Sequence, residues 1–167
     1  MPGVRPLTER RNESFVPKTQ KAKPRSQRGY NTNLASEFYA MSILYRMGLD
    51  ANLTLGNKKA VDIVVVHAAG KTITIDVKAV AGRVDWLVGN AAGPARKGHF
   101  VVLLAYDGKF GQLDHQPKAW VLPHAEFLGL IRTAKAPSIM RYVRRSEVAQ
   151  LAQRADAWHV LQDVQEA

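Results

Sequence analysis

The chain has 167 residues, a formal net charge of +10 at pH 7, five histidines and no cysteine. The lack of cysteine excludes disulfides, thiolate metal sites and a cysteine nucleophile. No apolar stretch approaches the length of a membrane span and no secretory signal is present, so we expect a cytoplasmic protein without a membrane partner. The excess of positive charge favours nucleic acid as a partner.

The first 30 residues are predicted to form a basic, disordered arm. They contain eight lysines and arginines, Glu9, Glu13, four prolines and few apolar residues, so they cannot bury enough surface to order themselves. We expect this arm to hold phosphates in a salt-dependent and sequence-independent way, with Arg25 and Arg28 among its contacts. A solubilising tail and a membrane-surface patch are the alternatives, and the glutamates and prolines argue against a mitochondrial presequence. Residues 31–167 suit a single domain.

Residues 33–48 are predicted to form a helix, with Asn33 as its N-cap and Gly48 just past its end. The predicted apolar stripe comprises Leu34, Phe38, Met41, Leu44 and Tyr45. Glu37 falls within that stripe, where a carboxylate is costly unless it is paired or bound to a metal. The alternative is that Glu37 complements the helix macrodipole at the edge of the stripe.

A short strand near residues 51–55 is followed by a predicted hairpin of residues 61–66 and 72–80. Both hairpin segments are rich in β-branched residues, and the stretch between them is short and contains Gly70. A loop centred near Ala69 places Asp62 opposite Asp76, with their Cβ atoms roughly 5 Å apart. Two like charges at that distance need a compensating positive charge, for which a divalent cation is the obvious candidate.

Lys78 is expected on the same strand face as Asp76, because residues two apart in a strand point to the same side. The opposite face is apolar and typical of a core: Ile73, Ile75 and Val77. Asp-x-Lys alone is a weak motif, since about one chance match is expected from 14 acidic residues and 11 lysines. A second match, at residues 107–109, follows an apolar run and is predicted to be a turn.

The rest of the chain predicts two strands, two helices and a long loop. Residues 100–106 predict a strand covered on both faces, and residues 119–122 predict another, followed by a helix with Pro123 in its first turn. Residues 141–164 are prone to form a helix with Ser146 as candidate N-cap. Three arginines there form a second basic cluster, for which a solvated face is the alternative: Arg141, Arg144 and Arg145. The histidines show no paired metal-ligand spacing, and a lone histidine is usually structural.

The glycine-rich loop of residues 81–98 is a candidate nucleic-acid contact. It offers Trp86 and basic side chains beside the predicted acids, although a partly buried Trp86 is an equal alternative. Together with the lysines before the hairpin, the predicted contacts are Lys58, Lys59, Arg83, Arg96 and Lys97.

The order of these acids resembles the PD-(D/E)xK nuclease superfamily, which includes many restriction endonucleases and the archaeal Holliday junction resolvases. The resemblance rests on a helix with Glu37, then Asp62 on one strand, then Asp76-Val77-Lys78 on the next. The glycine-containing segment 56–62 looks like the approach to the first aspartate in the resolvase-like branch, with Val61 where the signature has proline. The similarity covers residues 33–106.

The resemblance implies an α/β fold with a restriction-endonuclease-like core, a mixed β-sheet of four to five strands flanked by helices. It also implies Mg²⁺ or Mn²⁺ bound by Asp62 and Asp76, with the Val77 carbonyl as a further ligand and Glu37 helping directly or through water. Such a metal lowers the pKa of a bound water and neutralises charge on the phosphate. Lys78 would then orient or deprotonate the attacking water, or stabilise the pentavalent phosphorane. Because a lysine beside two carboxylates is expected to stay charged, positioning and stabilisation are favoured over the role of a general base.

The implied activity is metal-dependent hydrolysis of phosphodiester bonds in DNA, more than in RNA, with branched or junction DNA as one substrate. The alternatives are a catalytically inactive nucleic-acid-binding domain of the same fold and a buried Asp–Lys–Asp cluster without metal. The likeness to resolvases also makes a homodimer the natural expectation. The candidate surfaces are residues 100–106 or the segment with Trp158, Val160 and Leu161, unless these residues complete the monomer core.

Overall fold

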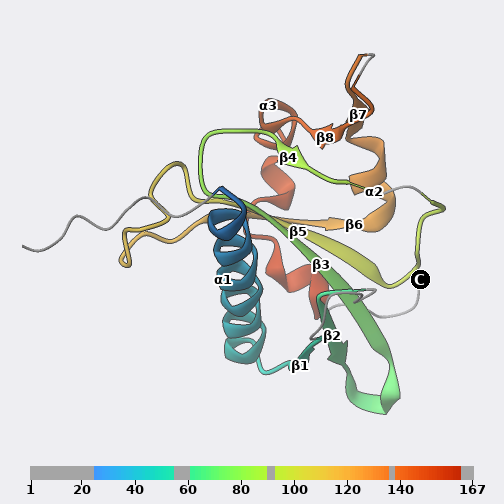
Figure 1. Ribbon diagram of the computed structural model, residues 1–167. Coiled ribbons are helices and arrows are strands. Elements are labelled where there is room, and N and C mark those ends of the chain that lie inside the picture. Colours follow the sequence, from blue (N-terminus) through green and yellow to red (C-terminus); the bar gives the residue numbers. More distant parts are fainter. Residues whose placement is uncertain (1–24, 55–60, 90–92, 136–137, 163–167) are drawn as a thin grey trace, which may run out of the picture.

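The computed structural model describes residues 25–54, 61–89, 93–135 and 138–162. The centre of the fold is a five-stranded mixed sheet (Figure 1). The strand order is β1-β2-β3-β5-β6. Strand β3 pairs in parallel with β5, and the other neighbouring pairs are antiparallel. The strand bounds are β1 Asp50–Leu53, β2 Ile63–Val66, β3 Thr72–Val80, β5 His99–Ala105 and β6 Lys118–Pro123. The predicted α/β class with a mixed sheet of four to five strands flanked by helices is confirmed.

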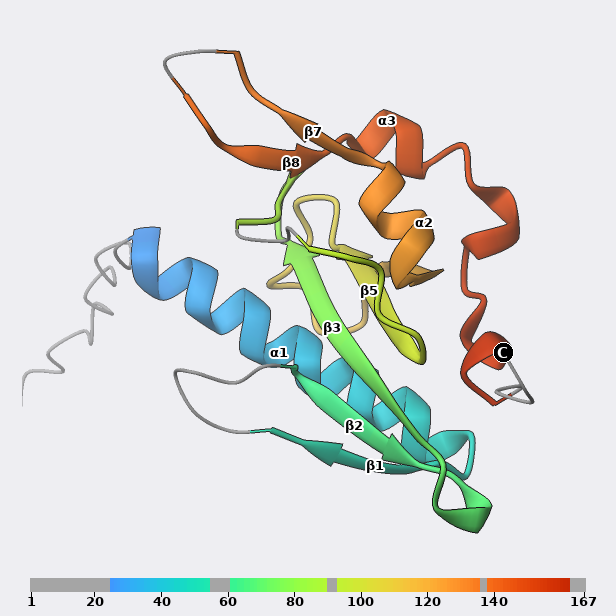
Figure 2. The ribbon, with the colours of Figure 1, turned by 90° about the vertical axis from the view of Figure 1, so that its right-hand side faces the viewer.

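Helices cover both faces of this sheet (Figure 2). The long helix α1, Arg25–Arg46, packs on one face together with the short 3-10 helix Trp158–Leu161. The other face carries helix α2, His124–Gly129, helix α3, Arg145–Val148, and a second sheet of order β4-β8-β7. Its strands are β4 Trp86–Leu87, β7 Ile131–Thr133 and β8 Arg141–Val143.

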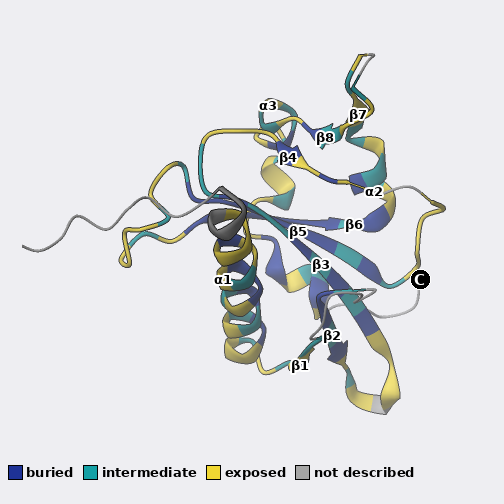
Figure 3. Cartoon of the chain, viewed as in Figure 1, coloured by how far each residue is buried: buried dark blue, intermediate teal, exposed yellow. Residues whose placement is uncertain are grey.

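Strand alternation builds a separate core on each face of the main sheet. In β5, Val102 and Leu104 join the core beneath α1, whereas Val101 and Leu103 join the core beneath α2 and the second sheet. Strands β5 and β6 are therefore buried over most of their length (Figure 3). The prediction of a strand covered on both faces at residues 100–106 is confirmed.

The buried face of α1 differs from the predicted apolar stripe. The helix begins at Arg25 rather than at Asn33, and Phe38 and Tyr45 are 56% and 58% exposed. Small side chains are buried at Ser36 and Ala40, and the larger Met41 and Ile43 pack against the core beside them. Of the five residues of the predicted stripe, Leu44 alone is fully buried.

The end of α1 agrees with the prediction for Gly48. This glycine has a φ of +77°, the left-handed conformation that favours glycine after a helix. Its N–H donates to the carbonyl of Tyr45 at 2.9 Å, and the N–H of Leu49 donates to the carbonyl of Leu44 at 3.0 Å. These two bonds form a Schellman motif, which turns the chain into β1.

The helix predicted over residues 141–164 is wrong. The segment forms strand β8, the four-residue helix α3 and two 3-10 turns, and the N-cap of α3 is Arg144 rather than Ser146. Strand β8 is paired on both sides, with β4 and β7, so tertiary pairing overrides the local helix propensity. Pro123, predicted in the first turn of the next helix, is instead the N-cap of α2.

Both predicted dimer surfaces belong to the monomer. Strand β5 lies between β3 and β6 instead of at an edge, and Trp158 and Leu161 are buried against α1 and the sheet. A homodimer therefore stays a prediction without an assigned surface. Within the described ranges, no helix is both long and apolar enough to cross a membrane. Of the predicted arm, residues 1–24 lie outside the described residues and residues 25–30 belong to α1.

Candidate active site

A cavity of about 260 Å³ opens between the middle of α1, the second half of β3 and β4. It exists because β2 stops pairing at Ile63, opposite Ile75, whereas β3 continues to Val80. The edge of β3 beyond Ile75 is thus left facing the cavity. The lining residues are Asn33, Glu37, Asp62, Val77, Lys78, Ala79, Trp86 and Leu87.

Two buried carboxylates line this cavity. Glu37 is 6% exposed and Asp62 is 7% exposed. The N–H of Asp62 donates to the carbonyl of Ile75 at 3.0 Å, and its Oδ2 accepts the N–H of Val77 at 2.7 Å. The carboxylate of Asp62 therefore replaces the missing β2 partner of Val77, which fixes its position at the cavity wall. The prediction that Glu37 lies on the inner face of its helix is confirmed.

Asp76 lies in a cluster of positively charged and ring nitrogen atoms. Its Oδ2 is 3.9 Å from Nζ of Lys78, 3.8 Å from Nη2 of Arg96 and 3.7 Å from Nε2 of His99. Burial pushes the pKa of Asp76 up, but the neighbouring His99 imidazole and the charges of Lys78 and Arg96 outweigh it, so the pKa lies below its ordinary value. Asp76 is therefore a stable anion that orients the groups around it.

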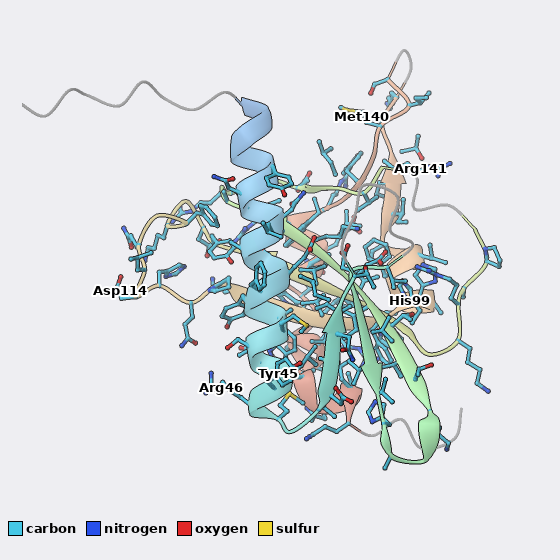
Figure 4. All side chains as sticks on the ribbon, turned by 60° about the horizontal axis from the view of Figure 1, so that its bottom comes forward. Tyr45, Arg46, His99, Asp114, Met140 and Arg141 are labelled. Atoms are coloured by element: carbon cyan, nitrogen blue, oxygen red, sulfur yellow. The ribbon has the colours of Figure 1, made fainter. Side chains whose placement is uncertain are left out.

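A histidine pair completes this cluster. His99, at the start of β5 (Figure 4), packs edge-to-face against His124 with ring centroids 4.7 Å apart, and its Nδ1 lies 2.8 Å from the hydroxyl of Thr74. The backbone N–H of Arg96 donates to Nδ1 of His124 at 3.0 Å, and its guanidinium contacts Nε2 of His99. Burial, followed by the charges of His99 and Arg96, lowers the pKa of His124.

The sequence did not point to the histidine pair. The parallel register places Thr74 beside His99, which brings His99 to the Asp76 face of β3. His124 then follows β6 at the start of α2. The sequence signal for His99 was its position directly before an apolar strand. That position indicates a place beside Asp76 only when the strand is known to pair with β3.

The hairpin has the predicted register, but the carboxylates of Asp62 and Asp76 do not face each other. The ladder runs from Val66 paired with Thr72 to Ile63 paired with Ile75, as a centre at residue 69 requires. Asp62 lies one residue beyond the last pair, and its carboxylate is directed to the Val77 N–H while that of Asp76 faces Arg96 and His99. Among the described residues, no three His, Asp or Glu side chains form a group that could hold a metal. Lys78 links the two parts, since it lines the cavity and pairs with Asp76.

The oxygen atoms of the cavity fit a hydrated divalent cation. Glu37 and Asp62 supply carboxylates, and the carbonyl of Val77 points to the same side of β3 as its N–H, which meets Asp62. Mg²⁺ commonly takes one or two protein carboxylates and keeps several waters. At roughly 30 Å³ for each water, the cavity is large enough for such a hydrated ion.

The predicted nucleic-acid contacts are partly placed by the structure. Arg83, Arg96 and Lys97 are exposed, and Arg96 also belongs to the Asp76 cluster. Lys58 and Lys59 lie outside the described residues, as do the side chains of the helical residues Arg25 and Arg28.

Trp86 is buried, which excludes the predicted role as an exposed contact. It is 1% exposed, its indole N–H donates to the carbonyl of Leu104 at 3.2 Å, and its ring packs against Trp120. The second Asp-x-Lys match is a turn as predicted, with positive φ at Asp107 and Gly108.

No protein-family model matches the chain, and no curated protein matches it. Among solved structures, the fold of this chain is similar to the structure of a bacterial homing endonuclease, with 20% sequence identity and a TM-score of 0.46. The match covers 78% of this chain and 89% of the other. The residues of the site therefore carry the functional assignment.

Proposed function

We propose that this protein is a metal-dependent nuclease that hydrolyses phosphodiester bonds in DNA. The observation that carries the proposal is the convergence of Glu37, Asp62 and Lys78 from three separate segments on one cavity. A further carboxylate, Asp76, pairs with the same lysine. The order of these residues along the chain is the one expected of the PD-(D/E)xK superfamily, to which we assign the protein as part of this proposal.

The proposed metal is Mg²⁺ or Mn²⁺, held by Glu37, Asp62 and the carbonyl of Val77. When bound, such an ion lowers the pKa of a bound water and neutralises negative charge on the phosphate. Asp76, predicted from the sequence as a ligand, is paired with nitrogen atoms of Lys78, Arg96 and His99. We therefore assign Asp76 a positioning role towards Lys78 and leave its part as a ligand to a direct test of metal affinity.

The side chains of the cavity suit hydrolysis of a phosphodiester. The Lys78 ammonium would donate hydrogen bonds to the phosphate oxygens and stabilise the charge that develops on them. The carboxylates of Glu37 and Asp62 would accept hydrogen bonds from the attacking water and so fix its direction. The water oxygen would bond to phosphorus and release its proton to solvent, while the bond from phosphorus to the leaving sugar oxygen breaks and that oxygen takes a proton from solvent.

A second candidate is a catalytically silent nucleic-acid-binding domain. One observation favours it: Lys78, Arg96 and His99 already surround Asp76, so this acid needs no metal to be stable in the fold. The net charge of +10 would serve binding alone equally well. The two candidates differ in one measurable property, which is metal-dependent cleavage.

The test is a cleavage assay on linear, nicked, branched and single-stranded DNA, with RNA of the same sequence, in Mg²⁺, Mn²⁺ or EDTA. We expect cleavage of DNA with either metal, none in EDTA, and none by Asp62→Asn. Asparagine keeps an oxygen that can accept the Val77 N–H, so this variant should fold. Binding without cleavage of any substrate would establish the silent domain instead, and an Asp62→Asn variant as active as the wild type would show the site to be elsewhere.

A further inference from the structure

The second sheet presents one face to solvent next to the cavity. Tyr142 of β8 pairs directly with Leu87 of β4 on one side and with Arg132 of β7 on the other. Directly opposed residues point to the same face of a sheet, so these three side chains form a row across it. Leu87 is 66% exposed and Arg132 is also exposed.

The inner face of the second sheet packs on the core, so the row on its other face is directed to solvent. The neighbouring residues Trp86, Val143 and Ile131 are likewise in register with one another. Trp86 and Val143 are buried in the core above the main sheet, and Ile131 packs against that core. Alternation along each strand therefore turns Leu87, Tyr142 and Arg132 outward.

This outward row continues from the wall of the cavity. Leu87 lines the cavity together with Glu37 and Asp62. Strand neighbours lie about 4.8 Å apart, so the row extends roughly 10 Å from Leu87 to Arg132. A polymer with one unit in the cavity would reach the row with the units next to it.

The surroundings of the row carry more positive than negative charge. Glu147 is shared by two arginines, with Oε2 at 3.0 Å from Arg132 and Oε1 at 3.8 Å from Arg144. Arg144 follows Tyr142 by two residues in extended backbone and so shares its face. With Arg83, Arg141 and Arg145 the sheet and its flanks hold five arginines against Asp85, Glu147 and the Asp107 that pairs with Arg145, a net charge of +2.

We propose that the outer face of the second sheet, formed by Leu87, Tyr142, Arg132 and Arg144, docks the nucleic-acid strand that continues from the cavity. Tyr142 and Leu87 offer an aromatic and an apolar surface to bases or sugars, and the arginines contact phosphates. This combination is typical of sequence-tolerant binding of a nucleic-acid strand. The inference rests on the proposed nuclease function, because it takes the cavity as the place of the scissile phosphate.

The experiment measures binding of the full chain to labelled single-stranded and duplex DNA in EDTA over a range of salt concentrations. Arg144→Ala should weaken binding about tenfold. It should also reduce the salt slope, the steepness with which the logarithm of the binding constant falls with the logarithm of salt concentration, by about one, as expected when one phosphate is no longer neutralised. Leu87→Glu should weaken binding more, because it places a carboxylate beside the strand. The matched control is Arg46→Ala, an exposed arginine in the last turn of α1 (Figure 4), about 13 Å along the helix from Glu37. It should bind within about twofold of the wild type.

The outcomes separate this inference from the proposed function. Unchanged binding by both Arg144→Ala and Leu87→Glu, in a protein that cleaves DNA, would overturn the docking surface and leave the nuclease intact. Weakened binding by these variants in a protein that cleaves nothing would support the surface and reject the nuclease. If Leu87→Glu lowers the melting temperature, the exposed Arg144→Ala carries the test. If the variants change the mass in light scattering instead of DNA affinity, the face joins copies of this chain and the proposal is wrong.

Discussion

The Nζ atom of Lys78 lies 3.9 Å from Oδ2 of Asp76, and Lys78 also lines the cavity that Glu37 and Asp62 share. The lysine is thus the connection between the buried carboxylates on one side of β3 and the ion cluster on the other. Its position depends on Asp76, which in turn is held by Arg96 and His99. Changes in that cluster should therefore act on catalysis through Lys78.

Replacement of this lysine gives the first prediction. Lys78→Ala should lower the cleavage rate about 100-fold or more, because a donor to the developing phosphate charge is removed. DNA affinity should change little, since the variant removes one of many positive charges. The measurement is the single-turnover cleavage rate together with the dissociation constant in EDTA.

The control for Lys78→Ala is Lys109→Ala. Lys109 ends the second Asp-x-Lys match, is exposed and lies in a turn outside the cavity. Its removal should leave the cleavage rate within about twofold. Equal losses of activity in the two variants would mean that lysine charge, and not the position of Lys78, supports cleavage.

A second prediction concerns metal affinity in the absence of DNA. Mg²⁺ or Mn²⁺ should raise the melting temperature of the wild type, because the ion binds the folded state. At ten times its dissociation constant it stabilises that state by about 1.4 kcal/mol. Glu37→Gln and Asp62→Asn should abolish this shift. Asp76→Asn should retain part of it, since Asp76 is engaged with nitrogen atoms instead of lining the cavity.

Two results would change that assignment. A complete absence of the shift in Asp76→Asn would make Asp76 a ligand, as the sequence predicted. A shift retained in both Glu37→Gln and Asp62→Asn would remove the metal from the cavity altogether. Titration calorimetry on the same variants provides the affinities directly.

The hairpin and its acids could be predicted because their signals are local. β-branched residues in two short runs around a glycine-containing loop fix a register, and the observed pairs from Ile63 with Ile75 to Val66 with Thr72 follow it. The directions of the Asp62 and Asp76 carboxylates could not be predicted, because the ladder ends at Ile63. Asp62 then meets the Val77 N–H, and Asp76 meets His99. Local pattern sets the register, whereas the directions of these side chains depend on contacts with distant residues.

The elements that the sequence predicted wrongly depend on long-range packing. The face of α1 was taken from large apolar residues, of which Leu44 is buried and Met41 packs against the core as expected, whereas Phe38 and Tyr45 are exposed. The small residues Ser36 and Ala40 are buried in their place. Strand β8 lies in a segment with helix propensity and is fixed by pairing with β4 and β7. The cluster of His99 with Asp76 needs the parallel pairing of β3 with β5, a non-local contact that no sequence spacing expresses.

A third prediction concerns pH and an ion pair outside the site. Asp107 pairs with the guanidinium of Arg145 and lies 3.3 Å from Nζ of Lys118. Burial raises the pKa of Asp107, but its hydrogen bonds to Arg145 and Lys118 outweigh it and the pKa is lowered. A depressed folded-state pKa stabilises the fold above the pKa of the unfolded chain, and this stability is lost as pH falls through the folded-state value.

Asp107→Asn should therefore lower the free energy of unfolding by about 1 kcal/mol at pH 7, with the difference shrinking as the solution becomes strongly acidic. Asparagine tolerates the positive φ at this position, so the backbone should not be strained. Urea unfolding at several pH values measures the effect, with the exposed Asp114→Asn (Figure 4) as control. A difference that does not depend on pH would show that charge is not its cause.

The last prediction concerns the basic arm. The structure sets the deletion boundary, because α1 begins at Arg25 and a cut within it would remove helical residues. Residues 1–24 hold six lysines and arginines against Glu9 and Glu13, a net charge of +4. Removal of these residues should weaken binding to all DNA sequences alike and reduce the salt slope, by up to roughly 0.9 for each duplex phosphate that the arm neutralises in the full chain. The melting temperature should stay within a few degrees of that of the full chain. An unchanged salt slope would show that the arm does not bind DNA, and a large decrease in stability would show that it packs on the domain.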